Sequence, residues 1–117
     1  MTAEIKRREC DPKLSDMVER AGVLHLAGQI PEDLTADTRG QTAEVLDLID
    51  RLLAKAGSDK SKLLSVIIYI ADMRDKPLVD EAWLAWADPK ALPARAVVET
   101  RLLSPDTRVE IVCTAAA

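Results

Sequence analysis

The amino-acid sequence predicts an α+β fold in which two helices cover one face of a single β-sheet. Residues 38–56 carry the apolar stripe of an amphipathic helix, and residues 63–71 form an apolar run rich in β-branched side chains. A second helical segment and two more strands complete the chain. Strand–helix–strand units need right-handed crossovers, so both helices should lie on the same face of the sheet. The expected architecture is a two-layer α/β sandwich of order ββαβαββ with a mixed six-stranded sheet.

The N-terminal half predicts short strands and the first helix. Strands are expected near residues 4–9 and 16–20, and residues 23–27 form another that Pro31 separates from the next segment. The first helix should end at Gly57, a typical C-terminal cap. Its inner stripe consists of apolar residues at helical spacing: Val45, Leu48, Ile49, Leu52, Leu53 and Ala56.

The C-terminal half predicts a central strand, a second helix and a hairpin. The run at 63–71 is the central strand, and Pro77 marks the first turn of the next helix. Strands are expected at 95–103 and 108–114, and the loop 104–107 suits a type I turn between them. The second helix should pack its inner stripe on the sheet: Val79, Ala82, Trp83 and Trp86. Stacking of the two tryptophans on a ligand or a base is the less favoured alternative.

The central strand is apolar on both faces. One face should carry Leu63, Ser65, Ile67, Tyr69 and Ala71, and the other Leu64, Val66, Ile68 and Ile70. Two helices cover only one face of a sheet, so the opposite face needs a cover that the helices do not supply. We therefore expect a homo-oligomer in which sheets pack against one another and leave grooves between subunits.

The predicted hairpin carries the strongest candidate site residues. An arginine fork such as that of Arg95 suits a planar carboxylate, and a carboxylate on an apolar strand, Glu110, needs a partner or a task. The expected register pairs Arg101 with Glu110 and places both on one face with Arg95, Val97 and Glu99. A cross-strand ion pair is then the structural alternative for Glu110. Arg95 lies roughly 20 Å from Arg101 at about 3.3 Å per residue, so Arg95 and Glu110 should meet only between subunits.

Composition excludes several classes of protein. A chain of 117 residues predicts a single domain over residues 1–117, and its net charge of −4 makes a nucleic-acid partner unlikely. There is neither a membrane-length apolar run nor a signal-peptide pattern, which predicts a cytoplasmic protein. Cys10 and Cys113 lack CxxC spacing and are expected to be reduced packing thiols, and with His25 they offer no metal-ligand pattern.

Asp72 and Asp75 follow the central strand and are expected to be loop and helix caps, paired catalytic carboxylates being the alternative.

Taken in order along the chain, several segments resemble the RidA/YjgF family, the reactive intermediate deaminases, over about residues 16–116. The segments are Gly22-Val23-Leu24-His25-Leu26-Ala27-Gly28-Gln29-Ile30-Pro31, Gln41-Thr42, Ala56-Gly57-Ser58, Ile70-Ala71-Asp72-Met73-Arg74-Asp75, Pro93-Ala94-Arg95 and Val109-Glu110-Ile111. The resemblance implies a chorismate-mutase-like fold and a homotrimer with sites in clefts between subunits. For active members it implies hydrolysis of 2-imino acids to 2-oxo acids and ammonia, without a metal or an organic cofactor.

The resemblance also implies roles for particular residues. Arg95 matches the arginine that holds the substrate carboxylate, Glu110 the acidic residue that positions or activates water, and Gly28 a glycine whose backbone lines the pocket. The chain departs from the family pattern at three substrate-pocket positions. Leu14 or Ser15 stands where active members have an aromatic residue, Asp80 where they have asparagine, and Val97 where they have cysteine. These differences are typical of a divergent branch.

Three functions follow as hypotheses. The first is a RidA-like protein that binds small 2-imino or 2-oxo acids and hydrolyses the imines, as a 2-iminobutanoate/2-iminopropanoate deaminase does. The second is a non-catalytic metabolite-binding or chaperone-like module that keeps the carboxylate grip. The third is the endoribonuclease or translation-inhibitor activity with which the family is labelled, which the acidic net charge disfavours.

Overall fold

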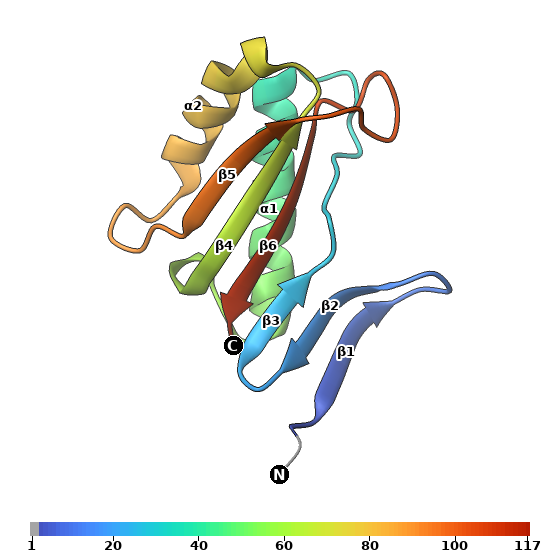
Figure 1. Cartoon of the computed structure of the whole chain (residues 1–117), viewed down its shortest axis with the longest axis vertical. Coiled ribbons are helices and arrows are strands. Elements are labelled where there is room, and N and C mark those ends of the chain that lie inside the picture. Colours follow the sequence, from blue (N-terminus) through green and yellow to red (C-terminus); the bar gives the residue numbers. More distant parts are fainter. Residues whose placement is uncertain (1–2) are drawn as a thin grey trace.

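The computed structural model describes residues 3–117 as one six-stranded sheet with two helices on one face (Figure 1). The strands lie in the order β1-β2-β3-β6-β4-β5. In chain order the elements are β1 (Ile5–Cys10), β2 (Ser15–Arg20), β3 (Val23–Leu26), α1 (Thr38–Lys55), β4 (Leu63–Ile70), α2 (Lys76–Trp86), β5 (Ala94–Glu99) and β6 (Val109–Ala116). The predicted α+β sandwich is confirmed, with three strands before α1 where the order ββαβαββ has two.

The predicted C-terminal hairpin is wrong. β5 runs parallel to β4, and β6 pairs antiparallel with the other edge of β4, so β4 separates β5 from β6. The crossover through α2 returns the chain in the direction of β4, which makes β5 the parallel neighbour. The predicted turn does form, since Thr107 N–H donates to Ser104 C=O at 3.1 Å, but inside a longer connection across the end of β4. β5 also ends at Glu99 instead of reaching residue 103.

Helix α1 forms where the sequence places its apolar stripe. Its first turn is capped by Asp37, whose side chain accepts a hydrogen bond from Gly40 N–H. Its C-terminal cap is Ala56, and Gly57 follows with a φ of +74°, the left-handed conformation that glycine adopts readily. The apolar residues of α1 that are fully or nearly buried are Val45, Leu46, Ile49, Leu52 and Leu53. The predicted stripe is therefore confirmed in part: Leu48 and Ala56 are only half-buried, and Leu46, which the spacing did not include, is buried instead.

Helix α2 buries its inner stripe beside α1. Trp83 is only 6% exposed, and Trp86 packs at the border of the core with its ring centre 5.6 Å from that of Trp83. Trp86 also donates its Nε1–H to Asp50 on α1 at 2.8 Å. The core-packing interpretation of the two tryptophans is therefore confirmed.

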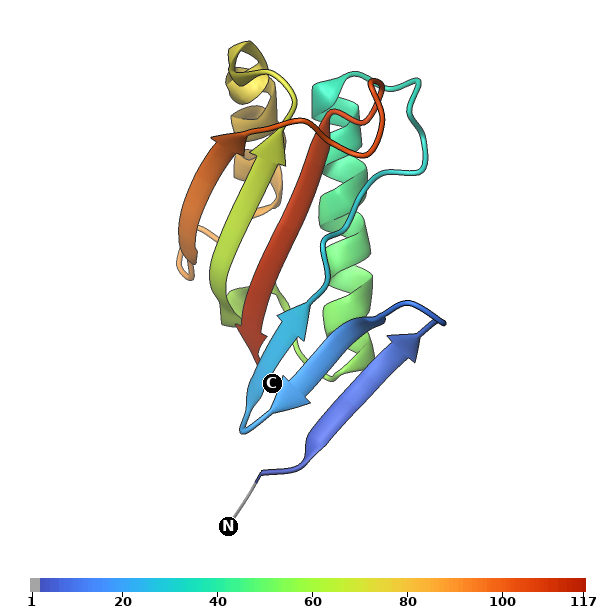
Figure 2. The same cartoon turned by 45° about the vertical axis from the view of Figure 1, so that its right-hand side comes forward.

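The two faces of the sheet differ in their cover. Figure 2 shows both helices on one side of the sheet, and no helix of residues 3–117 lies on the other. On β4 the side chains of Val66, Ile68 and Ile70 are buried against the helices, while Ile67 is 37% exposed on the open side. The alternation predicted for the start of β4 is wrong, because an irregularity between Leu63 and Ser65 buries Leu63 and leaves Leu64 exposed.

Candidate functional site

Arg95 lies on the helix-covered side of edge strand β5. It is the partner of Val66 on the parallel neighbour β4, so its side chain leaves the sheet on the same side as buried Val66. Its Nη2 donates to Oδ1 of Asp80 on α2 at 2.5 Å, and Lys76 Nζ contacts the other oxygen, Oδ2, at 2.7 Å. One carboxylate thus lies between two cations.

The guanidinium of Arg95 is also packed on an aromatic ring. Its central carbon lies 5.2 Å from the ring centre of Trp83, within the range of a cation–π contact. Its Nη1 is buried and has no hydrogen-bond partner among residues 3–117. A pocket of about 320 Å³ opens here, lined by Asp80, Trp83, Leu84 and Arg95. Val97, two residues along the same strand face, packs against the core.

Glu110 lies on the opposite, open face of the sheet. It is the β6 partner of Tyr69, which alternates on β4 with the buried Ile68 and Ile70. A pocket of about 470 Å³ surrounds it, lined also by Tyr69, Val112 and the connection 100–103. As an ionised carboxylate, Glu110 can only accept hydrogen bonds, so it is suited to orient a water molecule or take a proton from it.

Gly28 lies directly against Glu110. A Cβ atom added at Gly28 would overlap Oε2 of the Glu110 carboxylate. The backbone at this point is held to β6, because Gln29 and Ile111 exchange N–H···O=C hydrogen bonds of 2.9 and 3.0 Å. The absence of a side chain at residue 28 is therefore what leaves room for the carboxylate of Glu110.

One chain does not bring Arg95 and Glu110 together. Their partners on β4, Val66 and Tyr69, are an odd number of residues apart, so the two side chains leave the sheet on opposite faces. The predicted common face is therefore wrong. Arg101 lies in the loop after β5 and lines the pocket of Glu110, but among the described residues it makes no ion pair with that carboxylate.

The predicted aromatic-replacement positions lie far along the sheet from Arg95. Leu14 is 47% exposed in the turn between β1 and β2, and Ser15 begins β2 beside the Cys10 thiol, 3.3 Å from its Oγ. Three strands separate β2 from β5 in the sheet. Like Glu110, these residues do not meet Arg95 within one chain.

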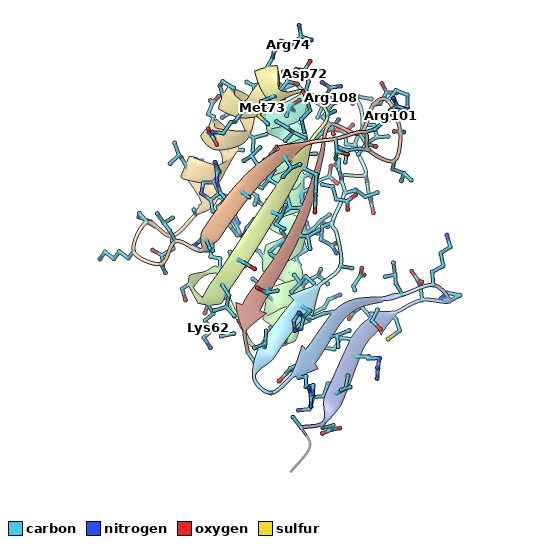
Figure 3. All side chains as sticks on the ribbon, viewed as in Figure 1. Lys62, Asp72, Met73, Arg74, Arg101 and Arg108 are labelled. Atoms are coloured by element: carbon cyan, nitrogen blue, oxygen red, sulfur yellow. The ribbon has the colours of Figure 1, made fainter. Side chains whose placement is uncertain are left out.

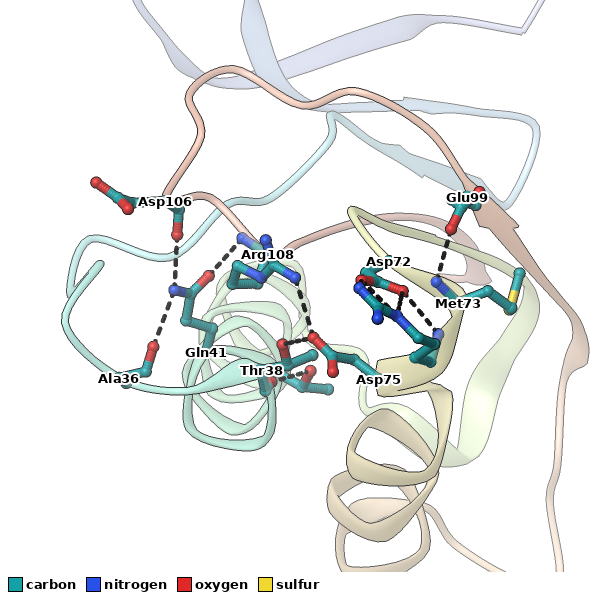
Figure 4. A network of polar contacts seen from close by, with 11 residues as sticks. Ala36, Thr38, Gln41, Asp72, Met73, Asp75, Glu99, Asp106 and Arg108 are labelled. Carbon is teal, nitrogen blue, oxygen red and sulfur yellow. Dashed lines mark hydrogen bonds and ion pairs between the residues drawn. The ribbon is translucent and has the colours of Figure 1, made fainter.

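A network of polar contacts fixes the end of the sheet where α1, α2 and β6 meet, and Figure 4 shows its members. Gln41 is fully buried; its Nε2 donates to the carbonyls of Ala36 and Asp106, and its Oε1 accepts from Arg108 N–H at 2.7 Å. In the sequence, Gln41 stands out only as part of the Gln41-Thr42 segment of the family resemblance. A buried side-chain amide with three backbone partners reveals its structural role only in the folded chain.

Asp72 and Asp75 lie at this same end of the sheet (Figure 4), where Figure 3 labels Asp72 together with Arg74 and Arg108. Hydrogen bonds from Arg74 lower the pKa of Asp72 to about 2. Hydrogen bonds from Thr38 and then Arg108 lower the pKa of Asp75. Asp72 caps the short turn Met73–Asp75, and Asp75 occupies the N-terminal cap position of α2. The capping interpretation is confirmed for Asp72, whereas the Asp75 side chain makes no capping hydrogen bond and binds Thr38 and Arg108 instead.

Further findings concern metal ligands, membrane-spanning helices and the two cysteines. Among residues 3–117, no group of His, Cys, Asp and Glu side chains is placed to hold a metal ion. In the same range, no helix combines the length and the apolar character needed to cross a membrane. Cys113 is buried, which raises its pKa to about 12, whereas Cys10 is exposed.

Comparisons with known proteins agree with this architecture. The family model described as "Endoribonuclease L-PSP" matches residues 6–117. A RutC family protein of Haemophilus ducreyi is 40% identical over 112 residues, which cover 96% of each chain. A YjgF family member from Neisseria meningitidis has a crystal structure that superposes with a TM-score of 0.92 at 42% identity, over 97% of this chain and 94% of that one.

A plant relative is more distant. It is the protein named Reactive Intermediate Deaminase A, chloroplastic, from Arabidopsis thaliana, 28% identical over 103 residues that cover 88% of this chain and 54% of the plant protein. The family model, the bacterial relative and the solved structure each cover nearly all of the chain, and the superposition shows that the solved structure has the same fold. This chain is a member of the RidA/YjgF family.

Proposed function

We propose that this protein binds small 2-imino and 2-oxo acids in clefts between the subunits of a homotrimer and hydrolyses the imines to 2-oxo acids and ammonia. The observation that carries the proposal is the division of the site within one chain. Arg95 and Glu110 each line a pocket, yet they face opposite sides of one sheet. Each is half of a site that a neighbouring subunit completes.

The open face supports the proposed assembly. Along β4, β5 and β6 it presents a continuous surface of mainly apolar side chains, and Val98 is 41% exposed there. The surface consists of Ser65, Ile67, Tyr69, Ala94, Ala96, Val98, Val112 and Thr114. Large exposed apolar surfaces on a sheet are typical of subunit interfaces. A neighbouring sheet packed here would bring its own edge strand toward the pocket of Glu110.

The chemistry needs few groups. The carbon of a 2-imino acid is already electrophilic, so hydrolysis requires an oriented water, a grip on the carboxylate and proton transfer. Arg95 of one subunit would hold the carboxylate, and Glu110 of the next would take a proton from the water that attacks C2. That proton then passes to the nitrogen and gives a carbinolamine. Its hydroxyl proton is transferred to the nitrogen as the C=O bond forms and the C–N bond breaks, and the products are ammonia and a 2-oxo acid. The name of the plant relative agrees with this chemistry.

A coupled assay tests the proposed activity. An amino-acid oxidase generates the imine in the presence of the protein, and the rate of 2-oxo acid formation is measured for wild type and Arg95→Ala. We expect the variant to lose the acceleration. The matched control is Arg74→Ala, because the Arg74 side chain is 89% exposed and, within residues 3–117, forms an ion pair only with Asp72. Equal rates for wild type and Arg95→Ala would contradict an arginine-dependent deaminase.

Subunit mixing tests the location of the site. Arg95→Ala and Glu110→Gln chains are unfolded together in equal amounts and refolded. Three-quarters of random trimers then contain both chains, and in each of these one of three clefts regains both residues, so about a quarter of the wild-type activity should return. No recovery from a mixture that refolds into trimers would contradict a shared site.

A second candidate is binding of such acids without turnover. The contact between Arg95 and Asp80 favours it, because a carboxylate of the chain already occupies part of the guanidinium. In that case 2-oxobutyrate raises the thermal midpoint of wild type but not of Arg95→Ala, and the coupled assay shows no acceleration.

A further inference from the structure

Asp80 places a negative charge in the otherwise positive pocket of Arg95. Arg95 and Lys76 contribute two positive charges, and Asp80 contacts both, so the three side chains together carry a net charge of +1. The group lies at the rim of the protein, since the Asp80 side chain is 32% exposed and that of Arg95 21%. A ligand that reaches Arg95 therefore meets a carboxylate as well as a guanidinium.

The geometry leaves Arg95 only partly satisfied. The contact with Asp80 uses Nη2, while the buried Nη1 has no partner among the described residues. A buried N–H without an acceptor is unfavourable, so an incoming carboxylate gains by supplying one. It must do so beside Asp80, whose negative charge repels it.

The effect of Asp80 depends on the charge of the ligand. A 2-oxo acid is a monoanion, and it feels the full repulsion of Asp80. A protonated 2-imino acid carries a positive nitrogen next to its carboxylate and has no net charge, so the repulsion is offset by attraction of that nitrogen to Asp80. Asparagine at this position would provide the hydrogen bond to Arg95 without the charge.

We propose that Asp80 is a selectivity residue that shifts the preference of the Arg95 pocket toward zwitterionic 2-imino acids and away from anionic 2-oxo acids. This inference rests on the proposed function, because it assumes that Arg95 holds the ligand carboxylate. Its consequence for turnover is weaker retention of the 2-oxo acid product. Asp80 acts by its charge on the ligand and by holding Arg95, and it takes no part in bond breaking.

The test compares two stable probes on variants that change the pocket charge in opposite directions. The probes are 2-oxobutyrate, an anion, and L-2-aminobutyrate, a zwitterion whose ammonium stands for the iminium. Asp80→Asn raises the net charge of the group to +2, and Lys76→Met lowers it to zero. Calorimetric dissociation constants are measured for both probes at low ionic strength, where such charge effects are least screened.

We expect Asp80→Asn to bind 2-oxobutyrate about five- to tenfold more tightly and Lys76→Met to bind it more weakly, because a single charge close to a half-exposed ligand has an effect of this order. Binding of L-2-aminobutyrate should change less than twofold in both variants. The ratio of the dissociation constants of 2-oxobutyrate and L-2-aminobutyrate should therefore fall in Asp80→Asn and rise in Lys76→Met. If Asp80 had only a structural role, these two variants would not shift the ratio in opposite directions. Asp80→Ser serves as a second charge-removing variant if the thermal midpoint of Asp80→Asn falls.

Each other outcome has a separate meaning. If Arg95→Ala loses both probes but Asp80→Asn leaves their ratio unchanged, the inference fails and the proposed binding site stands. If wild type binds neither probe, or if Arg95→Ala binds both as wild type does, the proposed function fails and takes the inference with it.

Discussion

The helix-covered face of the sheet and its open face differ in how completely the chain satisfies their side chains. On the covered face, buried residues of β4 and β6 pack against α1 and α2, and the polar groups at its end find partners in the same chain. On the open face, Ile67 and Val98 remain more than a third exposed, and Glu110 lines an open pocket. Apart from Nη1 of Arg95 at edge strand β5, which has no partner among the described residues, the covered face is packed and hydrogen-bonded within one chain, whereas the open face leaves apolar side chains exposed.

This difference separates the sources of stability and of function. Burial of aliphatic side chains under the helices provides the main driving force for folding. The residues proposed for chemistry lie at the edge of that layer or on the other face, where the proposed function requires a second subunit to complete the site. Substitutions on the covered face should therefore act first on stability, and those on the open face first on assembly and activity.

The largest expected difference is in thiol reactivity. Burial on the covered side of β6 raises the pKa of Cys113 to about 12, so at pH 8 only about one in ten thousand of these thiols is ionised. Cys10 is exposed. A chromogenic disulfide reagent should modify one thiol rapidly and the second only after urea is added, and Cys10→Ser should remove the rapid phase. Two rapid phases in the folded protein would contradict the covered packing of Cys113.

Two neighbouring isoleucines of β4 compare the faces directly. Ile68 is fully buried under the helices, and truncation to alanine should lower the free energy of unfolding by about 3–4 kcal/mol through lost burial and a cavity. Ile67→Ala removes the same atoms from the open face, and the isolated subunit should lose at most about 1 kcal/mol. Urea unfolding at low protein concentration measures both values. Sedimentation velocity should show weakened self-association only for Ile67→Ala, and equal unfolding losses would contradict the distinction between the faces.

Gly28→Ala acts on the open face at the proposed catalytic carboxylate. The added methyl group overlaps the end of the flexible Glu110 side chain, which can rotate away, so we expect little change in the thermal midpoint. Displacement of the carboxylate should lower imine hydrolysis about tenfold. Gly22→Ala is a poor control because Gly22 has a positive φ. The control is Ala116→Gly, which changes an open-face residue of β6, the strand of Glu110, at its far end beside Val23. Unchanged activity in Gly28→Ala would argue against a role for the present position of Glu110.

Much of the covered face could be predicted from sequence because its signals are local. The spacing of Val45, Ile49 and Leu52 identifies the buried side of α1, and the run at 63–71 identifies β4. The pairing of strands, by contrast, depends on residues that are far apart in the sequence. The turn at 104–107 predicts a hairpin, yet β4 offers both of its edges and takes β5 on one and β6 on the other. That choice depends on the crossover through α2, and it reversed the predicted relation between the faces of Arg95 and Glu110.

The family resemblance identifies the residues of the candidate site, but it does not predict which side chains they contact. Nothing in the spacing of Asp80 and Arg95 indicates a direct contact, because α2 and β5 are joined by a loop whose path is set by tertiary packing. The close approach of the Glu110 carboxylate to Gly28 likewise arises from the bridge between Gln29 and Ile111. Residues 82 positions apart in sequence come into contact only when β3 pairs with β6.

The smallest expected effect is the pH dependence contributed by Asp75, which ties the end of the covered face together. Hydrogen bonds from Thr38 and Arg108 hold its folded-state pKa below the ordinary value of 3.8. The stabilisation is therefore fully present above about pH 5 and is lost as the pH falls through 3.8 toward the folded-state pKa. Asp75→Asn should be less stable than wild type by at most about 1 kcal/mol at pH 7, because the contacts are partly exposed, and this difference should shrink at pH 3. Urea midpoints at both pH values measure it; a difference that grows on acidification would contradict the assignment, since it would require an Asp75 carboxyl that binds its proton more tightly in the folded chain than in the unfolded one.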